Sequence, residues 1–133
     1  METYSPAALC VQFLPKGQIL SVKEALDGEE QDHFTALIFK LGQRIHDMPA
    51  TYEQDGKGDD AIAYLHYFSS GCDWWITEKD VDGGIQEAFG LARLNGGHPS
   101  LGYISIAELS AIPTVEMDFY WTPKTLREVK NEN

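Results

Sequence analysis

One histidine and several carboxylates are the residues of this chain that could do chemistry. His66 precedes Asp73, and a histidine oriented by a carboxylate can act as a general base when the two groups lie within hydrogen-bond reach. Glu78 and Asp118 are further carboxylates that could complete such a site. The spacing does not bring these side chains together by itself, so His66, Glu78 and Asp118 are weak catalytic candidates. We therefore favour a binding protein over an enzyme.

Glu78, Asp80 and Asp82 alternate just before two glycines. Oxygen ligands at this spacing could bind Ca²⁺, but the twelve-residue loop and its terminal bidentate glutamate are missing. A solvated acidic turn is the commoner explanation. The four histidines form no H-E-x-x-H motif, and no G-x-G-x-x-G motif or phosphate-binding loop is present. We predict neither a metal site nor a cofactor.

Negative charge is spread along the chain. The net charge is −11, and residues 1–60 and 61–121 each carry −6. Lys79 and Arg93 are the basic residues of the second segment, so it has no cationic stripe that could neutralise phosphates. We expect no direct binding of nucleic acid. A negative field of this kind steers basic partners, which favours a protein partner with a basic surface.

Two kinds of side chain could bind such a partner. Carboxylates that face one way would attract cations, and exposed aromatic side chains are common anchors of interfaces. Trp74 and Trp75 are adjacent, so on a strand they must point to opposite faces, and one should lie near the surface. The aromatic residues as a group are also typical of a core. The candidates for partner binding are Asp59, Asp60, Asp73, Trp75, Glu78, Asp80, Asp82, Asp118 and Tyr120.

The first third of the chain should supply one clear helix. Between Glu30 and Asp47 the apolar residues recur at the spacing of one helical face. Upstream, residues 1–22 contain two short apolar runs, 8–14 and 18–22, separated by Pro-Lys-Gly. That punctuation predicts a hairpin of two short strands, with an irregular arm as the alternative.

The remainder of the chain has the pattern of strands and turns. Ser105 and Glu108 fit the S-x-x-E capping box and predict a short helix over 107–112. Gly90 lies inside a predicted strand and indicates a bulge or a close backbone approach. After Pro113 the alternation of apolar and polar residues predicts a last strand. The predicted strands are 61–68, 74–78, 85–94, 101–106 and 115–121.

This order of elements predicts an α+β fold. We expect a mainly antiparallel sheet of four to six strands, with one long and one short helix packed on one face. A single domain should cover residues 1–133, with an N-terminal arm plus helix in 1–60 and the sheet with its short helix in 61–129. Cys10 and Cys72 are isolated, and the chain has no basic-then-apolar leader and no long apolar span. We therefore expect a cytoplasmic protein with two free thiols.

Four runs carry a resemblance to a known family. They are 73–80 (DWWITEKD), 88–90 (AFG), 101–109 (LGYISIAEL) and 116–120 (EMDFY). Through these runs, residues 62–129 resemble a domain family of unknown function found in small proteins of phages, conjugative plasmids and integrative elements. The resemblance implies a mobile-element setting but brings no established catalytic residues.

Three functions are open at this point. The first is a small acidic accessory protein of a mobile element that acts by protein–protein interaction, as an anti-CRISPR or antirestriction inhibitor mimicking nucleic-acid charge. Its partner would be a host defence nuclease or CRISPR effector with a basic surface. The second is a small hydrolase or transferase that uses His66 with nearby carboxylates. The third is an accessory module that binds a host protein through Trp75 and Tyr120, with its charge incidental.

Overall fold

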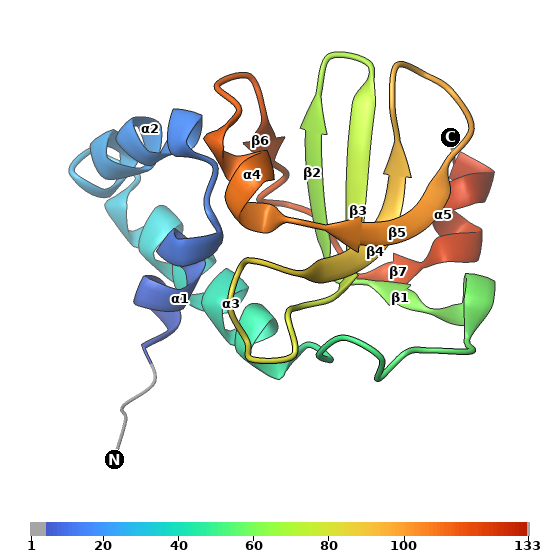
Figure 1. Cartoon of the computed structure of the whole chain (residues 1–133). Helices are drawn as coiled ribbons and strands as arrows, with labels where there is room; N and C mark the ends of the chain where they lie inside the picture. Colours follow the sequence, from blue (N-terminus) through green and yellow to red (C-terminus); the bar gives the residue numbers. More distant parts are fainter. Residues whose placement is uncertain (1–4, 133) are drawn as a thin grey trace.

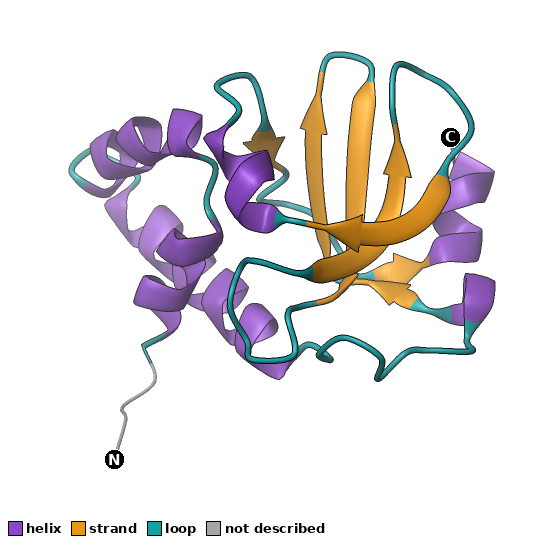
Figure 2. Cartoon of the chain, viewed as in Figure 1, coloured by secondary structure: helices purple, strands orange, loops and turns teal. Residues whose placement is uncertain are grey.

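An antiparallel sheet with helices packed against it forms the centre of the molecule (Figure 1, Figure 2). The computed structural model describes residues 5–132. Within them lies a five-stranded sheet of order β5-β4-β3-β2-β6, and β1 pairs with β7 in a two-stranded sheet. The strands are β1 (Ile62–Ala63), β2 (Leu65–Ser69), β3 (Cys72–Glu78), β4 (Ala88–Arg93), β5 (Ser100–Ile104), β6 (Glu116–Met117) and β7 (Lys124–Thr125). The predicted α+β fold with its antiparallel sheet is confirmed.

Helices lie on both sides of this sheet. In Figure 1, α1, α2 and α3 lie to the left of the strands and α5 to the right. The predicted long helix is confirmed as α3, and the predicted short one as α4, whose Ser105 side chain accepts a hydrogen bond from the Glu108 N–H. The helices of the described segment are α1 (Pro6–Phe13), α2 (Lys16–Leu26), α3 (Gln31–Asp47), α4 (Ile106–Ala111) and α5 (Leu126–Glu132), with a 3₁₀ turn at Gly58–Asp60. None of them combines the length and apolar character that crossing a bilayer requires.

The hairpin expected in residues 1–22 is wrong where the structure describes that segment. Its apolar runs form α1 and α2 instead, and residues 1–4 lie outside the described part of the chain. Ser5 caps α1 by accepting the Ala8 N–H, and Pro6 occupies the first turn, where proline needs no hydrogen-bond partner. Pro15 lies directly before α2, at its N-cap position. The prolines therefore begin helices here rather than mark a strand turn.

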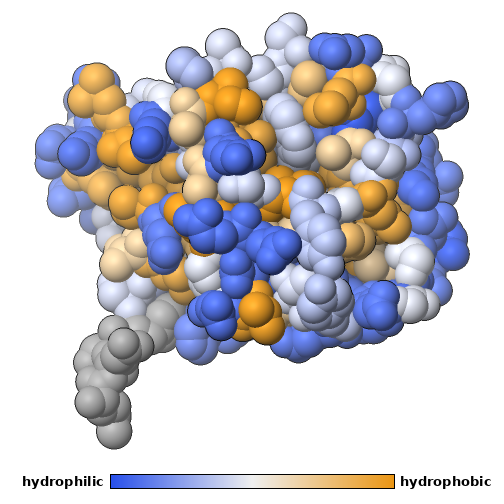
Figure 3. Space-filling model, in the orientation of Figure 1, coloured by the Kyte–Doolittle hydropathy of each residue, from blue (hydrophilic) through white to orange (hydrophobic). Residues whose placement is uncertain are grey.

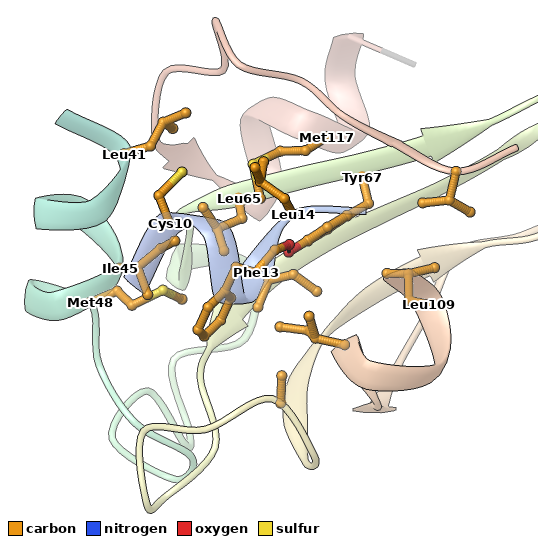
Figure 4. Close-up of a cluster of buried hydrophobic side chains, with 14 of the residues drawn as sticks. Cys10, Phe13, Leu14, Leu41, Ile45, Met48, Leu65, Tyr67, Leu109 and Met117 are labelled. Carbon is orange, nitrogen blue, oxygen red and sulfur yellow. Dashed lines mark hydrogen bonds between the residues drawn. The ribbon is translucent and has the colours of Figure 1, made fainter. Parts of the chain in front are cut away.

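The first helix packs between α3 and the sheet (Figure 4). Gly42 of α3 permits this closeness, since an added Cβ would lie 1.8 Å from the Pro6 carbonyl oxygen. Phe13 is fully buried, and its carbonyl accepts a hydrogen bond of 2.7 Å from the hydroxyl of buried Tyr67. Burial raises the pKa of the Cys10 thiol to about 12, and both Cys10 and Cys72 are free. The N-terminal helices thus complete the main core.

A second, smaller core lies on the opposite face of the sheet. Trp75 of β3 is 2% exposed there and packs with Leu91 and with Leu126 and Val129 of α5. Trp74 packs against the main core, so the two tryptophans do point to opposite faces. The sequence analysis did not predict α5. Its signal is a T-x-x-E box, in which Thr125 Oγ1 accepts the Glu128 N–H and Glu128 accepts the Thr125 N–H.

The strand predicted over 115–121 is much shorter in the structure. β6 ends at Met117, because the chain then turns and Asp118 accepts the Tyr120 N–H through its carboxylate at 3.0 Å. Trp121 consequently leaves the ladder and donates its indole N–H to the Ala63 carbonyl. The alternation of apolar and polar residues therefore extends further along the chain than the strand β6 does.

Gly90 of β4 and Gly102 of β5 are cross-strand partners with opposite surroundings. A Cβ at Gly90 would lie 2.0 Å from the Trp75 carbonyl oxygen, whereas a Cβ at Gly102 would meet no atom within 4 Å. The close backbone approach predicted for Gly90 is confirmed.

We predict that Gly90→Ala lowers the free energy of unfolding by about 1–3 kcal/mol, since the strands must move apart. Gly102→Ala is the matched control and should leave stability unchanged or slightly raised. Urea unfolding of both variants measures the difference. Equal stability of the two variants would contradict the close approach at Gly90.

Candidate functional site

A pocket of about 460 Å³ lies on the side of the sheet that carries the smaller core. The loop over residues 51–58 forms one wall, and the ends of β3, β4 and β5 form the floor. Its lining includes one buried carboxylate, Glu78, and the side chains of Phe89, Leu101 and Tyr103. All four residues stand in the runs that carry the family resemblance.

A β-bulge turns Glu78 toward this pocket. Ile76 pairs with Gly90, but the next pairing joins Glu78 to Phe89, so Thr77 is an extra residue on β3. A shift of one residue exchanges the faces of a strand. Without the bulge, Glu78 would point to the main apolar core; with it, Glu78 shares the face of Phe89.

The loop after α3 is pinned against the end of β3. Thr51 donates its N–H and hydroxyl to the Lys79 carbonyl, each at 2.7 Å. Gln54 is 6% exposed, and its amide bonds the backbone of Ile62 and of Thr77. The polar segment 53–60 therefore contains a buried anchor, Gln54. Tertiary hydrogen bonds make the loop a wall of the pocket.

Glu78 is a buried carboxylate whose partners are backbone groups. It is 3% exposed and accepts the Tyr52 N–H at 2.9 Å. Burial raises its pKa above the ordinary 4.5; Asp55 and Glu53 add to that rise, and the backbone N–H groups of Tyr52 and Gln54 oppose it. Among the described residues, no lysine, arginine or histidine forms an ion pair with Glu78.

Two tyrosines stand at the mouth of the pocket. The hydroxyls of Tyr52 and Tyr103 are 2.7 Å apart, and the two residues are 65% and 54% exposed. Tyr103 meets Phe89 edge to face, with ring centroids 5.6 Å apart. The bond to Tyr52 raises the pKa of Tyr103, and the negative charges of Glu87 and Asp55 add to it. Tyr52 has a positive φ of 80°, a strained conformation of the kind found where a site depends on it.

This arrangement suits a cationic guest. A carboxylate out of water gains most from a partner that brings a positive charge and hydrogen-bond donors. Tyrosine and phenylalanine rings attract cations through their faces. A guanidinium or ammonium group on an apolar stem would combine the positive charge, the donors and the apolar surface that such groups attract.

His66 belongs to a different cluster. Its Nε2 is 2.9 Å from Asp73 Oδ1, and its Nδ1 is 3.6 Å from Asp118 Oδ2. Asp73 also accepts a hydrogen bond of 2.9 Å from Arg93. The histidine thus meets two of the carboxylates that the sequence offered as its partners, Asp73 and Asp118, but not the third, Glu78. Glu78 follows Trp75, the cross-strand partner of His66, by three residues, about 10 Å along the strand.

Aromatic rings enclose His66. The ring stacks on Trp75 at 5.4 Å with an interplanar angle of 7° and lies 5.1 Å from the ring of Trp121. Its side chain is 15% exposed. The cluster therefore fastens β2, β3 and the chain after β6 to one another.

Several of the predicted partner-binding acids have cationic partners within the chain. Asp59 pairs with Lys130 at 2.7 Å, a hydrogen bond that lowers the pKa of Asp59. Asp60 pairs with Arg127. These contacts tie α5 to the 3₁₀ turn and neutralise both carboxylates locally.

The acids of the β3–β4 connection have different surroundings. Asp80 is 8% exposed and accepts the N–H groups of Asp82 and Glu87, so its carboxylate closes the turn. Asp82 is exposed. Within residues 5–132, no group of three or more His, Cys, Asp or Glu side chains is arranged to hold a metal ion.

The two aromatic candidates differ. Tyr120 is 64% exposed, and its hydroxyl forms a hydrogen bond of 3.0 Å with His33. Trp75, expected as an exposed anchor, is buried, because α5 covers its face of the sheet. That expectation is corrected: Trp75 supports the fold and offers no surface. The sequence analysis did not name four of the pocket residues as site candidates: Tyr52, Phe89, Leu101 and Tyr103. The last three lie in the runs that carry the family resemblance, whereas the place of Tyr52 depends on the 51–58 loop.

A known family model matches the part of the chain that forms the sheet. Residues 37–125 match the family described as protein of unknown function (DUF2958). The chain belongs to this family. The resemblance to a family of unknown function is confirmed, and the DUF2958 match begins upstream of the predicted residue 62, within α3. No curated protein and no solved structure gave a significant match.

The raised pKa of Glu78 gives a prediction about stability. The folded chain holds the Glu78 proton more tightly than the unfolded chain, so this stabilisation is fully present below the unfolded pKa and is lost as the pH rises through the folded pKa. Glutamine has no carboxyl proton to lose, so Glu78→Gln should not show this loss of stability with rising pH. Relative to wild type, the variant should gain stability as the pH rises above the ordinary glutamate pKa of 4.5 and through the raised pKa of Glu78, as measured by urea unfolding. Asp82→Asn is the control at an exposed carboxylate; an equal gain there would contradict burial as the cause.

Proposed function

We propose that this DUF2958 protein acts by protein–protein interaction and binds a basic partner by receiving a lysine or arginine side chain in the Glu78 pocket. One observation carries the proposal. Glu78 is a buried carboxylate in an aromatic pocket, and the described part of the chain provides no cationic side chain paired with it. A partner's cation would supply the missing charge.

The charges around the pocket favour the same guest. Asp55 and Glu53 raise the pKa of Glu78, and Asp55 and Glu87 raise that of Tyr103, so the pocket lies in a negative field. The net charge of −11 extends this field beyond the pocket. Long-range attraction speeds association with basic partners, while the buried contact governs how long the complex lasts.

The pocket supports the proposal better than a row of acids does. Asp59 and Asp60 pair with cations of α5, and Asp80 closes a turn. Their charges are therefore already balanced or held by the chain. The hydrolase alternative has its histidine and carboxylates side by side, but aromatic rings enclose His66 and the pocket lies elsewhere.

A pocket for lysine or arginine side chains indicates which class of protein could be the partner. Proteins that handle nucleic acids present lysine and arginine to phosphates, and an acidic protein can cover those cations. A host defence nuclease or CRISPR effector is the partner that the resemblance to mobile-element proteins favours. Inhibition of such a target, as an anti-CRISPR or antirestriction protein, is the narrower form of our proposal.

The pocket can be tested with a single side chain. N-acetyl-arginine amide should shift the NMR signals of Tyr52, Phe89 and Tyr103, and its citrulline analogue, which has the same shape without the charge, should bind at least about tenfold more weakly. Glu78→Gln should weaken arginine binding by about tenfold or more. Binding should also weaken at low pH, as Glu78 becomes protonated.

Asp82→Asn is the matched control because it removes the same charge from an exposed turn outside the pocket. It should change the affinity for arginine less than twofold. Equal losses in Asp82→Asn and Glu78→Gln would show that general surface charge, and not the pocket, binds the cation. An equal affinity for arginine and citrulline would contradict the proposal.

A further inference from the structure

The strand β5 leaves one edge of the main sheet open. It is the last strand on its side and pairs with β4. Among the described residues, the backbone of Ser100–Ile104 forms no hydrogen bond outside that pairing. In an antiparallel strand, alternate residues direct their N–H and C=O groups away from the neighbour. β5 therefore offers a row of free donors and acceptors.

The opposite edge of the same sheet is closed. β6 is two residues long, and the side chain of Gln18 covers its outer side. Gln18 accepts the Met117 N–H at 2.7 Å and donates to the Met117 carbonyl at 3.2 Å. The amide thus takes the place that another strand would occupy. One edge is protected against pairing, and the other is not.

The residues of β5 do not hinder the approach of another chain. The strand Ser-Leu-Gly-Tyr-Ile contains no charge and no proline, the usual devices that protect an edge. Leu101 and Tyr103 are 48% and 54% exposed, and open space surrounds the Cα of Gly102. Figure 3 shows apolar surface among hydrophilic surface on the side where β5 runs in Figure 1.

The open edge continues into the Glu78 pocket. Leu101 and Tyr103 line that pocket, and both pair with pocket-face residues of β4, Leu91 and Phe89. Side chains of a strand alternate between faces. Every second side chain of a strand added to β5 would therefore lie on the pocket face, beside Tyr103.

We propose that the partner's binding segment adds to β5 as a β-strand and that its lysine or arginine side chain enters the Glu78 pocket from this strand. The inference rests on the proposed function and names the form of the ligand: an extended segment with basic residues at alternate positions. Main-chain bonds to β5 supply affinity, and the pocket selects the cation. The negative charges of Glu78, Asp55 and Glu87 are the reason why we expect the added strand to carry basic residues.

The probe is a seven-residue peptide of alternating threonine and arginine, acetylated and amidated at its ends. We expect it to bind at least about tenfold more tightly than N-acetyl-arginine amide, because backbone bonds are added. Amide hydrogen exchange in residues 100–104 should slow when the peptide binds. The exchange of Met117, whose N–H already has a partner, is the internal control.

Two N-methylated peptides decide whether backbone pairing occurs. In an extended peptide the arginine N–H groups lie along one edge and the threonine N–H groups along the other. Methylation of one set should abolish the tenfold gain, and methylation of the other set should preserve it. Equal effects of both sets, unchanged exchange in residues 100–104, or no gain over the single amino acid would each overturn strand addition.

These outcomes are separate from the test of the pocket. If arginine binding depends on Glu78 but the peptide shows no edge-specific effect, the proposed function stands and strand addition fails. The opposite result is also possible: the peptide slows amide exchange in residues 100–104, only one of the two methylated peptides loses affinity, and Glu78→Gln binds the peptide as tightly as wild type. In that case strand addition stands and the pocket proposal fails.

Discussion

The pairing shift between β3 and β4 decides where the carboxylate of Glu78 lies. With Thr77 as the extra residue, Glu78 is removed from the face of the main core and placed opposite Phe89. An ionised group on the core face would be very costly to bury. On the pocket face, backbone N–H groups of the 51–58 loop stabilise it. The presence of a carboxylate in the pocket depends on this one displacement.

Lys79 connects the N-terminal helices to the Glu78 pocket. Its ammonium group donates to the Ile45 and His46 carbonyls at the end of α3, at 2.8 Å and 2.7 Å, where a cation suits the helix dipole. Its backbone pairs with the loop that carries Tyr52. One residue directly after Glu78 thus couples the end of the long helix, the loop and the sheet. The helical segment is therefore part of what shapes the pocket.

The acidic character of the chain serves two different purposes. Asp59, Asp60 and Asp73 balance cations of the chain and fasten elements together. Within residues 5–132, no cationic side chain pairs with Glu78, and burial raises the pKa of this carboxyl. Composition alone assigns the same charge to all of them. Their roles in the structure differ because their burial and their hydrogen-bond and ion-pair partners differ.

Local rules were enough for some elements. The apolar spacing of α3 and the capping box at Ser105 depend on residues a few positions apart, and the alternation of Trp74 and Trp75 depends on strand geometry alone. Gly90 likewise indicated a close approach before the neighbouring strand was known.

Other features depend on distant residues. The sequence determined an acidic α+β chain, its main helix, most of its strands and its family. Tertiary structure decided that the first apolar runs are helices packed on α3, that Trp75 is covered by α5, and that His66 meets Asp118. It also decided that Tyr52, far from Glu78 in the chain, becomes its hydrogen-bond donor. Burial and pairing between distant segments are properties of the packed chain, and no local pattern of residues contains them.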